Sequence, residues 1–540
     1  MSQKLSLPQV PTSGLFKQGY NTYQSEDGVV NRNIAAVRDI ASMVRTSVGP
    51  SGRNKIIVNQ IQKVFLTSDA STILRELDII HPAVKVVVMA SQQQDFELGD
   101  ASNLVVILAG EFLNQAEELL RIGMSPSEIA QGFELAKNRA LKALTEAESD
   151  PQVTNAQVLK SVIAPKQYGH EDVLAKLCAE AIEYVWPQNA RFFNVDNVRV
   201  VKIMGASLYA SKVIKGMVFP NKPEGSVQAV ESGKVAVYTA PVDISQTEAK
   251  GTVLLHNAQE MLDFSKGEEN RLNAFVNDLK AAGVSVVVGG AGFGGLAVHY
   301  LNKHGILAFK IGSKFDLQRL ARVTGASPLP TLKVPQPEQL GTIDAVTVEE
   351  IGGNRVTVFE QRDTRTRTAT IVLRGATQNL LDDVERAIDD GVSAVKALTK
   401  SRSLVPGAGS TEMAIAADVF AEGERTPGTL QHAVKAYARA FEAVPRVLAD
   451  NAGLDGTEVV SNIYAAPKSG APGVDIESES PTGVIDARDA GIWDIALAKR
   501  SAIDLASEAA ITVLTVDQII MAKRAGGPAM PKQGGDWDQD

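Results

Sequence analysis

The chain has 540 residues, of which 44% are hydrophobic and 22% charged, a composition typical of a folded protein of about three or four domains. Its net charge of -9, without a long basic run, makes nucleic acid and anionic membranes unsuitable partners. The single cysteine, Cys178, excludes an intrachain disulfide and fits a reducing compartment. No apolar run approaches the ~18 residues of a membrane span, and the N-terminal region lacks the pattern of a secretory signal. We therefore expect a cytosolic protein.

Two glycine- and aspartate-containing turns stand out near the start of the chain. They are Val48-Gly49-Pro50-Ser51-Gly52 and Leu98-Gly99-Asp100-Ala101-Ser102-Asn103, and the second opens directly onto an apolar run that begins at Leu104. A glycine-rich turn that leads into a buried helix presents unpaired backbone N–H groups and the positive end of the helix dipole, which favours phosphate. Since Asp100 alone would repel phosphate, a Mg²⁺ ion between them is expected. The alternative is a simple helix cap by Asp100 or Ser102.

Between these turns, the sequence predicts a hairpin from residues 54–59 and 64–67, two β-rich runs around a short polar turn. A lone two-stranded hairpin is marginal in water, so we expect it to pair with further strands. Further along, Ser125-Pro126-Ser127-Glu128 is a capping box that starts a helix. The apolar residues on one face of that helix are Ile129, Phe133, Ala136, Ala140 and Leu144.

Helices alternate with strands over roughly residues 201–374, with strands expected at 234–238, 284–288 and 370–373. From Gln378 onward helices dominate again, and the Gly/Pro-rich tail after Ala522 is expected to be disordered. The order helical, α/β, helical indicates one all-α domain assembled from both ends of the chain, with the middle inserted into it.

A G-x-G-x-x-G run, Gly290-Ala291-Gly292-Phe293-Gly294-Gly295, follows one of the expected strands and precedes a helix. In a dinucleotide site the next strand would end in an acidic residue that binds the ribose, but here it ends in Ile311-Gly312, and Asp316 comes late. A tight strand-to-helix turn is the preferred interpretation. A nucleotide-dependent oxidoreductase remains the alternative. The six histidines and one cysteine show no metal-ligand spacing, so transition-metal catalysis and a cysteine nucleophile have no support.

Several motifs together resemble, in order and spacing, the signatures of the group II chaperonins. Over nearly the whole chain these are Thr46 to Lys55, Ser68-Asp69-Ala70-Ser71-Thr72-Ile73-Leu74, Gly99 to Asn103, Asp389-Asp390-Gly391-Val392, Val405-Pro406-Gly407-Ala408-Gly409 and residues 513–520. Finer features resemble one particular subunit type of the cytosolic chaperonin of eukaryotes: His81-Pro82-Ala83, Lys166-Gln167-Tyr168-Gly169, residues 264–270, Ala525-Gly526-Gly527-Pro528 and Asp536-Trp537-Asp538.

The resemblance implies a multidomain α and α/β fold. Residues 1–150 and 407–540 would form an all-α equatorial, ATP-binding domain with a β-hairpin that joins strands from a neighbouring subunit's termini. Residues 151–218 and 368–406 would form a small intermediate hinge domain. Residues 219–367 would form an α/β apical, substrate-binding domain, with residues 244–255 in a lid-forming protrusion and residues 268–282 and 313–323 facing the cavity. The sparse apolar side chains on those two stretches are Leu272, Phe275, Val276, Phe315, Leu317 and Leu320.

The resemblance also implies the roles of individual residues toward ATP or ADP and Mg²⁺. Asp69 and Asp390 match the two aspartates that position water, and Asp100 matches the metal ligand. Asp390 would reach the nucleotide only when the intermediate domain closes. Without the resemblance, Asp69 could be a helix cap and Asp390 a solvated helix residue. The matching nucleotide-binding positions are Val48, Gly49, Pro50, Asp100, Ala101, Ser102, Asn103, Leu104, Ala164, Pro165, Lys166, Gly407 and Asp494. By the resemblance, Lys166 would lie near the γ-phosphate, and Gly407 and Asp494 on the purine and ribose side.

Some positions depart from the family pattern. Ala101 and Ala408 replace glycines of the Gly-Asp-Gly-Thr and triple-glycine turns, and Ala164-Pro165 replaces a Ser-rich loop. An alanine costs up to ~1 kcal/mol if the position needs positive φ. We expect Ala101 and Ala408 to slow nucleotide turnover without abolishing binding.

The predicted function is that of an ATP-hydrolysing chaperone subunit in a hetero-oligomeric double ring of paralogous subunits, which folds clients such as actin and tubulin by resemblance. A structural ring subunit that binds nucleotide but hydrolyses it slowly is the alternative.

Overall fold

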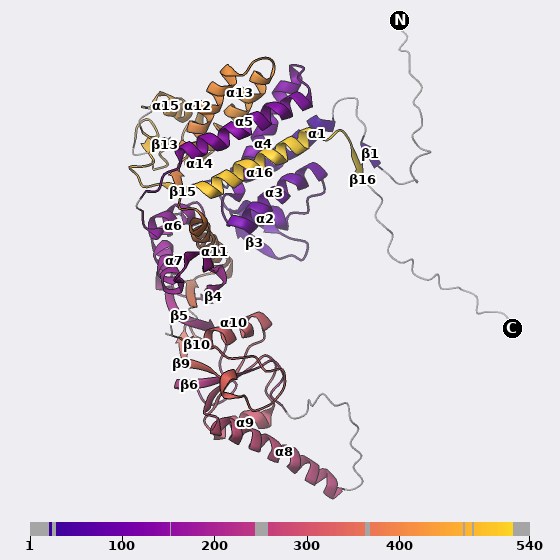
Figure 1. Ribbon diagram of the computed structural model, residues 1–540, viewed down its shortest axis with the longest axis vertical. Coiled ribbons are helices and arrows are strands. Elements are labelled where there is room, and N and C mark those ends of the chain that lie inside the picture. Colours follow the sequence, from indigo (N-terminus) through magenta and orange to yellow (C-terminus); the bar gives the residue numbers. More distant parts are fainter. Residues whose placement is uncertain are drawn as a thin grey trace, which may run out of the picture.

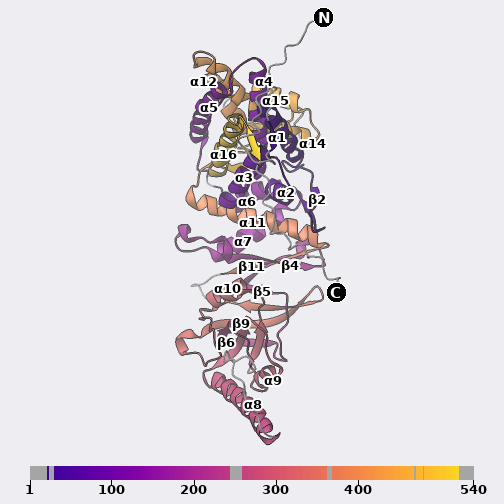
Figure 2. The same ribbon diagram turned by 90° about the vertical axis from the view of Figure 1, so that its right-hand side faces the viewer.

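The computed structural model describes residues 21–23, 29–151, 153–243, 258–361, 368–467, 470–477 and 480–521. The molecule is elongated, with a helical part at one end, a small mixed part in the middle and a sheet-containing part at the other end (Figure 1). The first and last thirds of the chain lie together in the helical part, while the centre of the chain forms the far end. The view turned by 90° shows the same three levels stacked along the long axis (Figure 2).

Both ends of the chain contribute to the largest hydrophobic core of the helical part. Phe112 stacks on Tyr437 with ring centroids 4.2 Å apart, and Phe133 and Phe441 pack edge-on against the same ring. All four aromatic side chains are fully buried. The helices from the first third are α1 (Val29–Arg45), α2 (Ala70–Glu76), α3 (Pro82–Leu98), α4 (Ser102–Arg121) and α5 (Pro126–Ala147). Those from the last third are α12 (Ser410–Arg425), α13 (Leu430–Ala440), α14 (Ala443–Ala452), α15 (Gly456–Ala465) and α16 (Ala496–Leu514).

The expected capping box at the start of α5 is confirmed. Ser125 accepts a hydrogen bond from the backbone N–H of Glu128, and the Glu128 carboxylate accepts one from the N–H of Ser125. The five apolar residues expected on one face of the helix are all buried. Local sequence therefore set both the start of this helix and the face that it buries.

The sheet has eight strands in the order β4-β11-β5-β10-β9-β6-β7-β8. The three strands expected from the sequence are present. The pairs β4/β11, β6/β7 and β7/β8 are parallel, but the strands between them run antiparallel, which βα alternation alone did not indicate. The cause at β9/β10 is a two-residue turn, Gly352-Gly353, with φ of 63° and 79°, the geometry of a tight hairpin. The strands are β4 (Val198–Met204), β5 (Lys212–Phe219), β6 (Ala229–Tyr238), β7 (Val284–Gly289), β8 (Leu307–Lys310), β9 (Gly341–Ile351), β10 (Asn354–Glu360) and β11 (Ala369–Gly375).

The middle part places helices from two distant segments on one end of this sheet. Helices α6 (Asn155–Ile163), α7 (Glu171–Val185) and α11 (Gln378–Lys400) share a core with β4 and β11 that includes the single cysteine, Cys178. Helix α11 also reaches the helical part, since Arg386 donates a hydrogen bond to the carbonyl of Leu66 on strand β3 (Val64–Thr67). This contact ties the middle part to the segment that precedes Asp69.

The expected hairpin forms from β2 (Lys55–Val58) and β3 (Val64–Thr67), and it pairs with no further strand among the described residues. Near the two termini, β1 (Asn21–Tyr23) pairs with β16 (Ile519–Met521). Short strands β12 (Leu404–Pro406) and β15 (Trp493–Ile495) also pair, as do β13 (Pro472–Val474) and β14 (Val484–Asp486). The expected lid segment 244–255 and the tail after Ala522 lie outside the described residues.

At the far end, α8 (Ala258–Ala281), α9 (Gly295–Lys303) and α10 (Lys314–Thr324) pack on the sheet. Of the sparse apolar side chains in the two stretches expected to face the cavity, Leu272, Val276, Leu317 and Leu320 are buried in the cores under α8 and α10. Phe315 is 73% exposed. The described helices include none with the length and apolar content that a membrane crossing requires.

Candidate active site

A cavity of about 650 Å³ opens between the helical part and the start of the middle part. Its walls come from both ends of the chain and from the loop after α6. Of the sequence-predicted binding residues, all except Gly407 line it: Val48, Gly49, Pro50, Asp100, Ala101, Ser102, Asn103, Leu104, Ala164, Pro165, Lys166 and Asp494. Gly407 packs against the Asp494 carboxylate, and Asp69 and Asp390 lie behind the wall, each in contact with a residue that lines it.

Three helices that begin at this cavity lack a side-chain cap. Ala101, Gly409 and Ile495 are the capping positions of α4, α12 and α16, and none of them makes a side-chain capping bond. The first turn of a helix carries unpaired N–H groups and a partial positive charge. Their convergence makes the cavity a favourable site for an anion such as a phosphate group.

The turn between α3 and α4 brings a carboxylate into this cavity. Gly99 ends α3 with φ of 70°, and the Asp100 carboxylate accepts a hydrogen bond from the N–H of Ala101 at 2.7 Å. A Cβ on Gly99 would lie only 2.4 Å from the Cβ of Ser393 on α11, so this glycine lets α11 approach the turn. Burial raises the pKa of Asp100 against the opposing effect of Lys166. A cation bound beside Asp100 would offset the cost of that burial.

Asp69 serves as a helix cap, as the alternative interpretation expected, and it also faces the site. Its carboxylate accepts hydrogen bonds of 2.9 Å from the N–H of Thr72 in α2 and from the hydroxyl of Ser102 in α4. Burial alone would raise the pKa of Asp69, but the Lys166 ammonium and these hydrogen bonds outweigh it and hold the pKa below its usual range. Asp69 is therefore an ionised acceptor at neutral pH.

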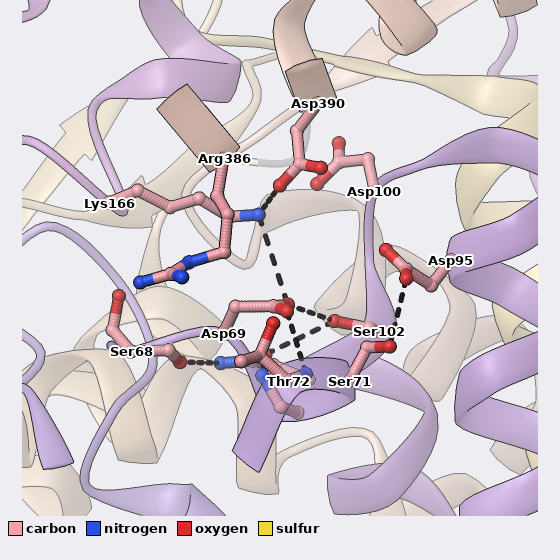
Figure 3. A network of polar contacts seen from close by, with 12 residues as sticks. Ser68, Asp69, Ser71, Thr72, Asp95, Asp100, Ser102, Lys166, Arg386 and Asp390 are labelled. Carbon is pink, nitrogen blue, oxygen red and sulfur yellow. Dashed lines mark hydrogen bonds and ion pairs between the residues drawn. The ribbon is translucent and has the colours of Figure 1, made fainter. Parts of the chain in front are cut away.

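Lys166 connects the distant carboxylates (Figure 3). Its ammonium forms an ion pair with Asp390 on α11 and lies 3.9 Å from the nearer oxygen of Asp69. Figure 3 shows Asp100 and Asp390 beside each other, with Lys166 between this pair and Asp69. Asp390 thus lies close to the other two carboxylates in this conformation.

Sequence analysis missed two charged residues that line the cavity, Lys499 and Glu412. The Lys499 ammonium lies 2.8 Å from the Asp494 carboxylate and 2.5 Å from that of Glu412. A lysine in the otherwise apolar start of α16 is the signal that could have found it, since a buried lysine requires a carboxylate partner.

The two alanines that replace family glycines both adopt the left-handed conformation. Ala101 has φ of 64° and Ala408 has φ of 55°. The Cβ of Ala408 packs against Gly473, where an added Cβ would lie 2.8 Å away. An L-residue in this region is strained by about 1 kcal/mol relative to glycine. Both positions therefore require positive φ, the condition under which an alanine is less favourable than a glycine.

The G-x-G-x-x-G run forms the turn from β7 to α9 and takes no part in this cavity. A Cβ on Gly294, which caps α9, would lie 2.6 Å from the carboxylate of Asp243. A carboxylate this close to the start of α9 would repel a phosphate bound there.

Comparisons with known proteins agree with the motifs. Residues 40–524 match the model of the TCP-1/cpn60 chaperonin family. The T-complex protein 1 subunit theta of Saccharomyces cerevisiae is 53% identical over 565 residues, which cover 99% of this chain and 100% of the relative. The theta subunits of Mus musculus and Homo sapiens are each 45% identical over 545 residues, covering 99% of both chains.

The relatives also confirm the finer prediction. Theta is the subunit type that the segments around His81 and Lys166 indicated. The family match likewise supports the predicted chaperone function over the oxidoreductase alternative. The chain belongs to the TCP-1/cpn60 chaperonin family and acts as a molecular chaperone.

Proposed function

We propose that the cavity binds ATP with Mg²⁺ and that this chain hydrolyses ATP to drive protein folding. The observation that carries the proposal is the convergence of Asp69, Asp100 and Asp390, from three distant segments, around Lys166 beside a cavity with uncapped helix starts. Phosphoryl transfer needs positioning and charge stabilisation more than covalent chemistry, and this arrangement supplies both.

Each residue has a distinct task in this proposal. The backbone of residues 49–50 and 101–104 and the Lys166 ammonium would hold the phosphates. Asp100 would hold Mg²⁺, which supplies positive charge against the charge that develops on the phosphate oxygens. A single carboxylate suits an ion that relies on substrate phosphates and water for its other ligands, and the described residues contain no cluster of three or more metal-ligating side chains. Asp69 and Asp390 would orient the attacking water and accept its proton.

The rest of the proposal extends to assembly. The chain would occupy a hetero-oligomeric double ring of paralogous subunits in the cytosol and fold clients such as actin and tubulin. The helical, middle and far parts would be its equatorial domain (1–150 and 407–540), intermediate domain (151–218 and 368–406) and apical domain (219–367). Exposed Phe315 on α10 would be one contact for clients.

The direct test is subunit-specific photolabelling of the purified complex with 8-azido-ATP, with the labelled chain identified by mass spectrometry. We expect label on this chain that depends on Mg²⁺ and is displaced by ATP. Native mass measurement of the same complex should give a hetero-oligomer. A chain that takes no displaceable label, or that assembles only with itself, would contradict the proposal.

A slowly hydrolysing subunit is the second candidate, favoured by the left-handed backbone at Ala101 and Ala408. We expect the double variant Ala101→Gly/Ala408→Gly to raise ATP turnover on this chain, by up to about fivefold for each ~1 kcal/mol of strain that the glycines relieve in the transition state. Release of phosphate from assembled rings measures this. Ala206→Gly is the matched control, since Ala206 has φ of 60° and lies outside the cavity lining. Unchanged turnover in the double variant would remove this candidate.

A further inference from the structure

A buried charge triad, Asp494–Lys499–Glu412, lies under one side of the cavity. We propose that Lys499, held by Glu412, is a positioning residue that fixes the Asp494 carboxylate to receive the ribose hydroxyls of the bound nucleotide. The triad would thereby set a preference for ribonucleotides over deoxyribonucleotides. This inference rests on the proposed nucleotide site.

The three charged side chains become more exposed in the order Glu412, Lys499, Asp494. The side chains of Glu412 and Lys499 are 3% and 8% exposed, whereas that of Asp494 is 36% exposed. All three residues contribute to the cavity lining, but only Asp494 presents substantial surface. The outer carboxylate can therefore meet a ligand while the inner pair supports it.

Local structure explains why Lys499 can reach both partners. It lies in the first turns of α16, and helical side chains tilt toward the N-terminal end, which brings its ammonium back to Asp494 on β15. Glu412 lies in the first turn of α12, where the helix dipole stabilises a carboxylate. A lysine near a helix N-terminus is unfavourable by itself, so the two carboxylates are what make its burial tolerable.

The contacts of Asp494 leave one oxygen free for a ligand. Oδ2 accepts from Lys499 at 2.8 Å, and Gly407 packs on the same oxygen, since a Cβ there would lie 3.2 Å away. No hydrogen bond to Oδ1 is found within the described residues. Because β15 pairs with β12, with Asp494 opposite Val405, the backbone of Asp494 is also fixed. A rotationally fixed carboxylate with one free oxygen suits a hydroxyl donor such as a ribose 2′- or 3′-OH.

Glu412 has no separate role toward the ligand in this arrangement. Its Oε1 binds Lys499, and its Oε2 is buried without a hydrogen-bond partner in the part of the chain that is described. A buried carboxylate with an unsatisfied oxygen is costly, which is consistent with its retention for the sake of Lys499.

The test uses the assembled complex and photolabelling of this chain by 8-azido-ATP, with ATP, 2′-deoxyATP and 3′-deoxyATP as competitors. For the wild type we expect ATP to compete at least about tenfold better than either deoxynucleotide, the effect of losing one hydrogen bond to a charged group. In Lys499→Met/Glu412→Gln, which removes both inner charges together, the ratio should fall to about twofold or less. Lys499→Arg should retain most of the preference.

The matched control is Lys137→Met/Glu134→Gln on α5. Lys137 is a lysine of similar burial, 9% exposed, whose carboxylate partners are outside the cavity lining. The control variant Lys137→Met/Glu134→Gln should keep the full preference for ATP over the two deoxynucleotides. If Lys499→Met/Glu412→Gln does not assemble, Glu412→Gln alone should give an intermediate ratio.

The outcomes separate the inference from the site itself. An unchanged ATP preference in Lys499→Met/Glu412→Gln or in Glu412→Gln would overturn the inference and leave the nucleotide site in place. A wild-type chain whose label ATP does not displace would overturn the proposed function instead. Equal loss of preference in the Lys137 control would show that any buried ion pair has this effect, and the positioning role would then be rejected.

Discussion

Asp390→Ala is expected to reduce ATP hydrolysis on this chain by a factor of about 100 to 1,000 while leaving nucleotide binding nearly unchanged. The loss is that expected for a general base or water-positioning carboxylate. Asp390 is preferred to Asp69 as a target because Asp69 also caps α2, so that its removal would disturb the helix as well as the chemistry, whereas Lys166 still has Asp69 as a partner when Asp390 is removed. Asp390 lies within α11 and caps no helix.

The measurement must separate this chain from other nucleotide-binding subunits. Assembled complex is photolabelled with 8-azido-ATP that carries a radioactive phosphorus at either the α or the γ position. The variant chain should retain both labels over a time in which the wild-type chain loses the γ label. Asp389→Asn on the same helix is the control, since Asp389 is exposed and is not part of the cavity lining. Loss of the γ label from Asp390→Ala at the wild-type rate would show that Asp390 does not take part in hydrolysis.

Much of the local structure follows from the sequence. The capping box at Ser125, the hairpin at β2 and β3, and the buried strands β7 and β11 each depend on residues close together in the chain. The spacing of apolar residues along the chain and the residue types at turns and helix ends specify such features directly. The grouping of the predicted binding residues around one cavity came from the resemblance to the family, since nothing local in residues 99–103 points to Lys166 or Asp494.

The missed features depend on tertiary packing. Lys499 and Glu412 are 87 residues apart, so no spacing rule links them. An amphipathic pattern tells which side chains of α8 and α10 share a face but not what covers that face, so the burial of their apolar residues in the cores of the far part was not predicted. From the sequence, Ala101 and Ala408 are strained relative to glycine only if their φ angles are positive. The backbone of the folded chain shows that both angles are positive.

Lys166→Met is expected to move the acid limb of the pH–rate profile to higher pH and to weaken nucleotide binding. Lys166 lowers the pKa of Asp69, against burial, and it also opposes the rise in the pKa of Asp100. Without the ammonium, the pKa of Asp69 rises, so a larger fraction of the carboxylate is protonated at a given low pH and cannot accept a proton. Activity therefore falls at a higher pH than in the wild type, while the profile above neutral pH changes less.

The same substitution, Lys166→Met, also removes the ion-pair partner of Asp390. Its carboxylate is 14% exposed and loses its ion-pair partner, a change that costs about 3–5 kcal/mol for a buried pair when one member is removed. Repulsion among Asp69, Asp100 and Asp390 should then push α11 away from the turn at Gly99, which fits against Ser393 only at close approach. Amide hydrogen exchange in residues 383–393 should increase in the nucleotide-free complex. Lys202→Met is the matched control, since Lys202 pairs with Asp382 and Glu385 on the same helix but outside the cavity lining. An acid limb and an exchange rate in Lys166→Met that equal those of the control would mean that this lysine does not hold the carboxylates together.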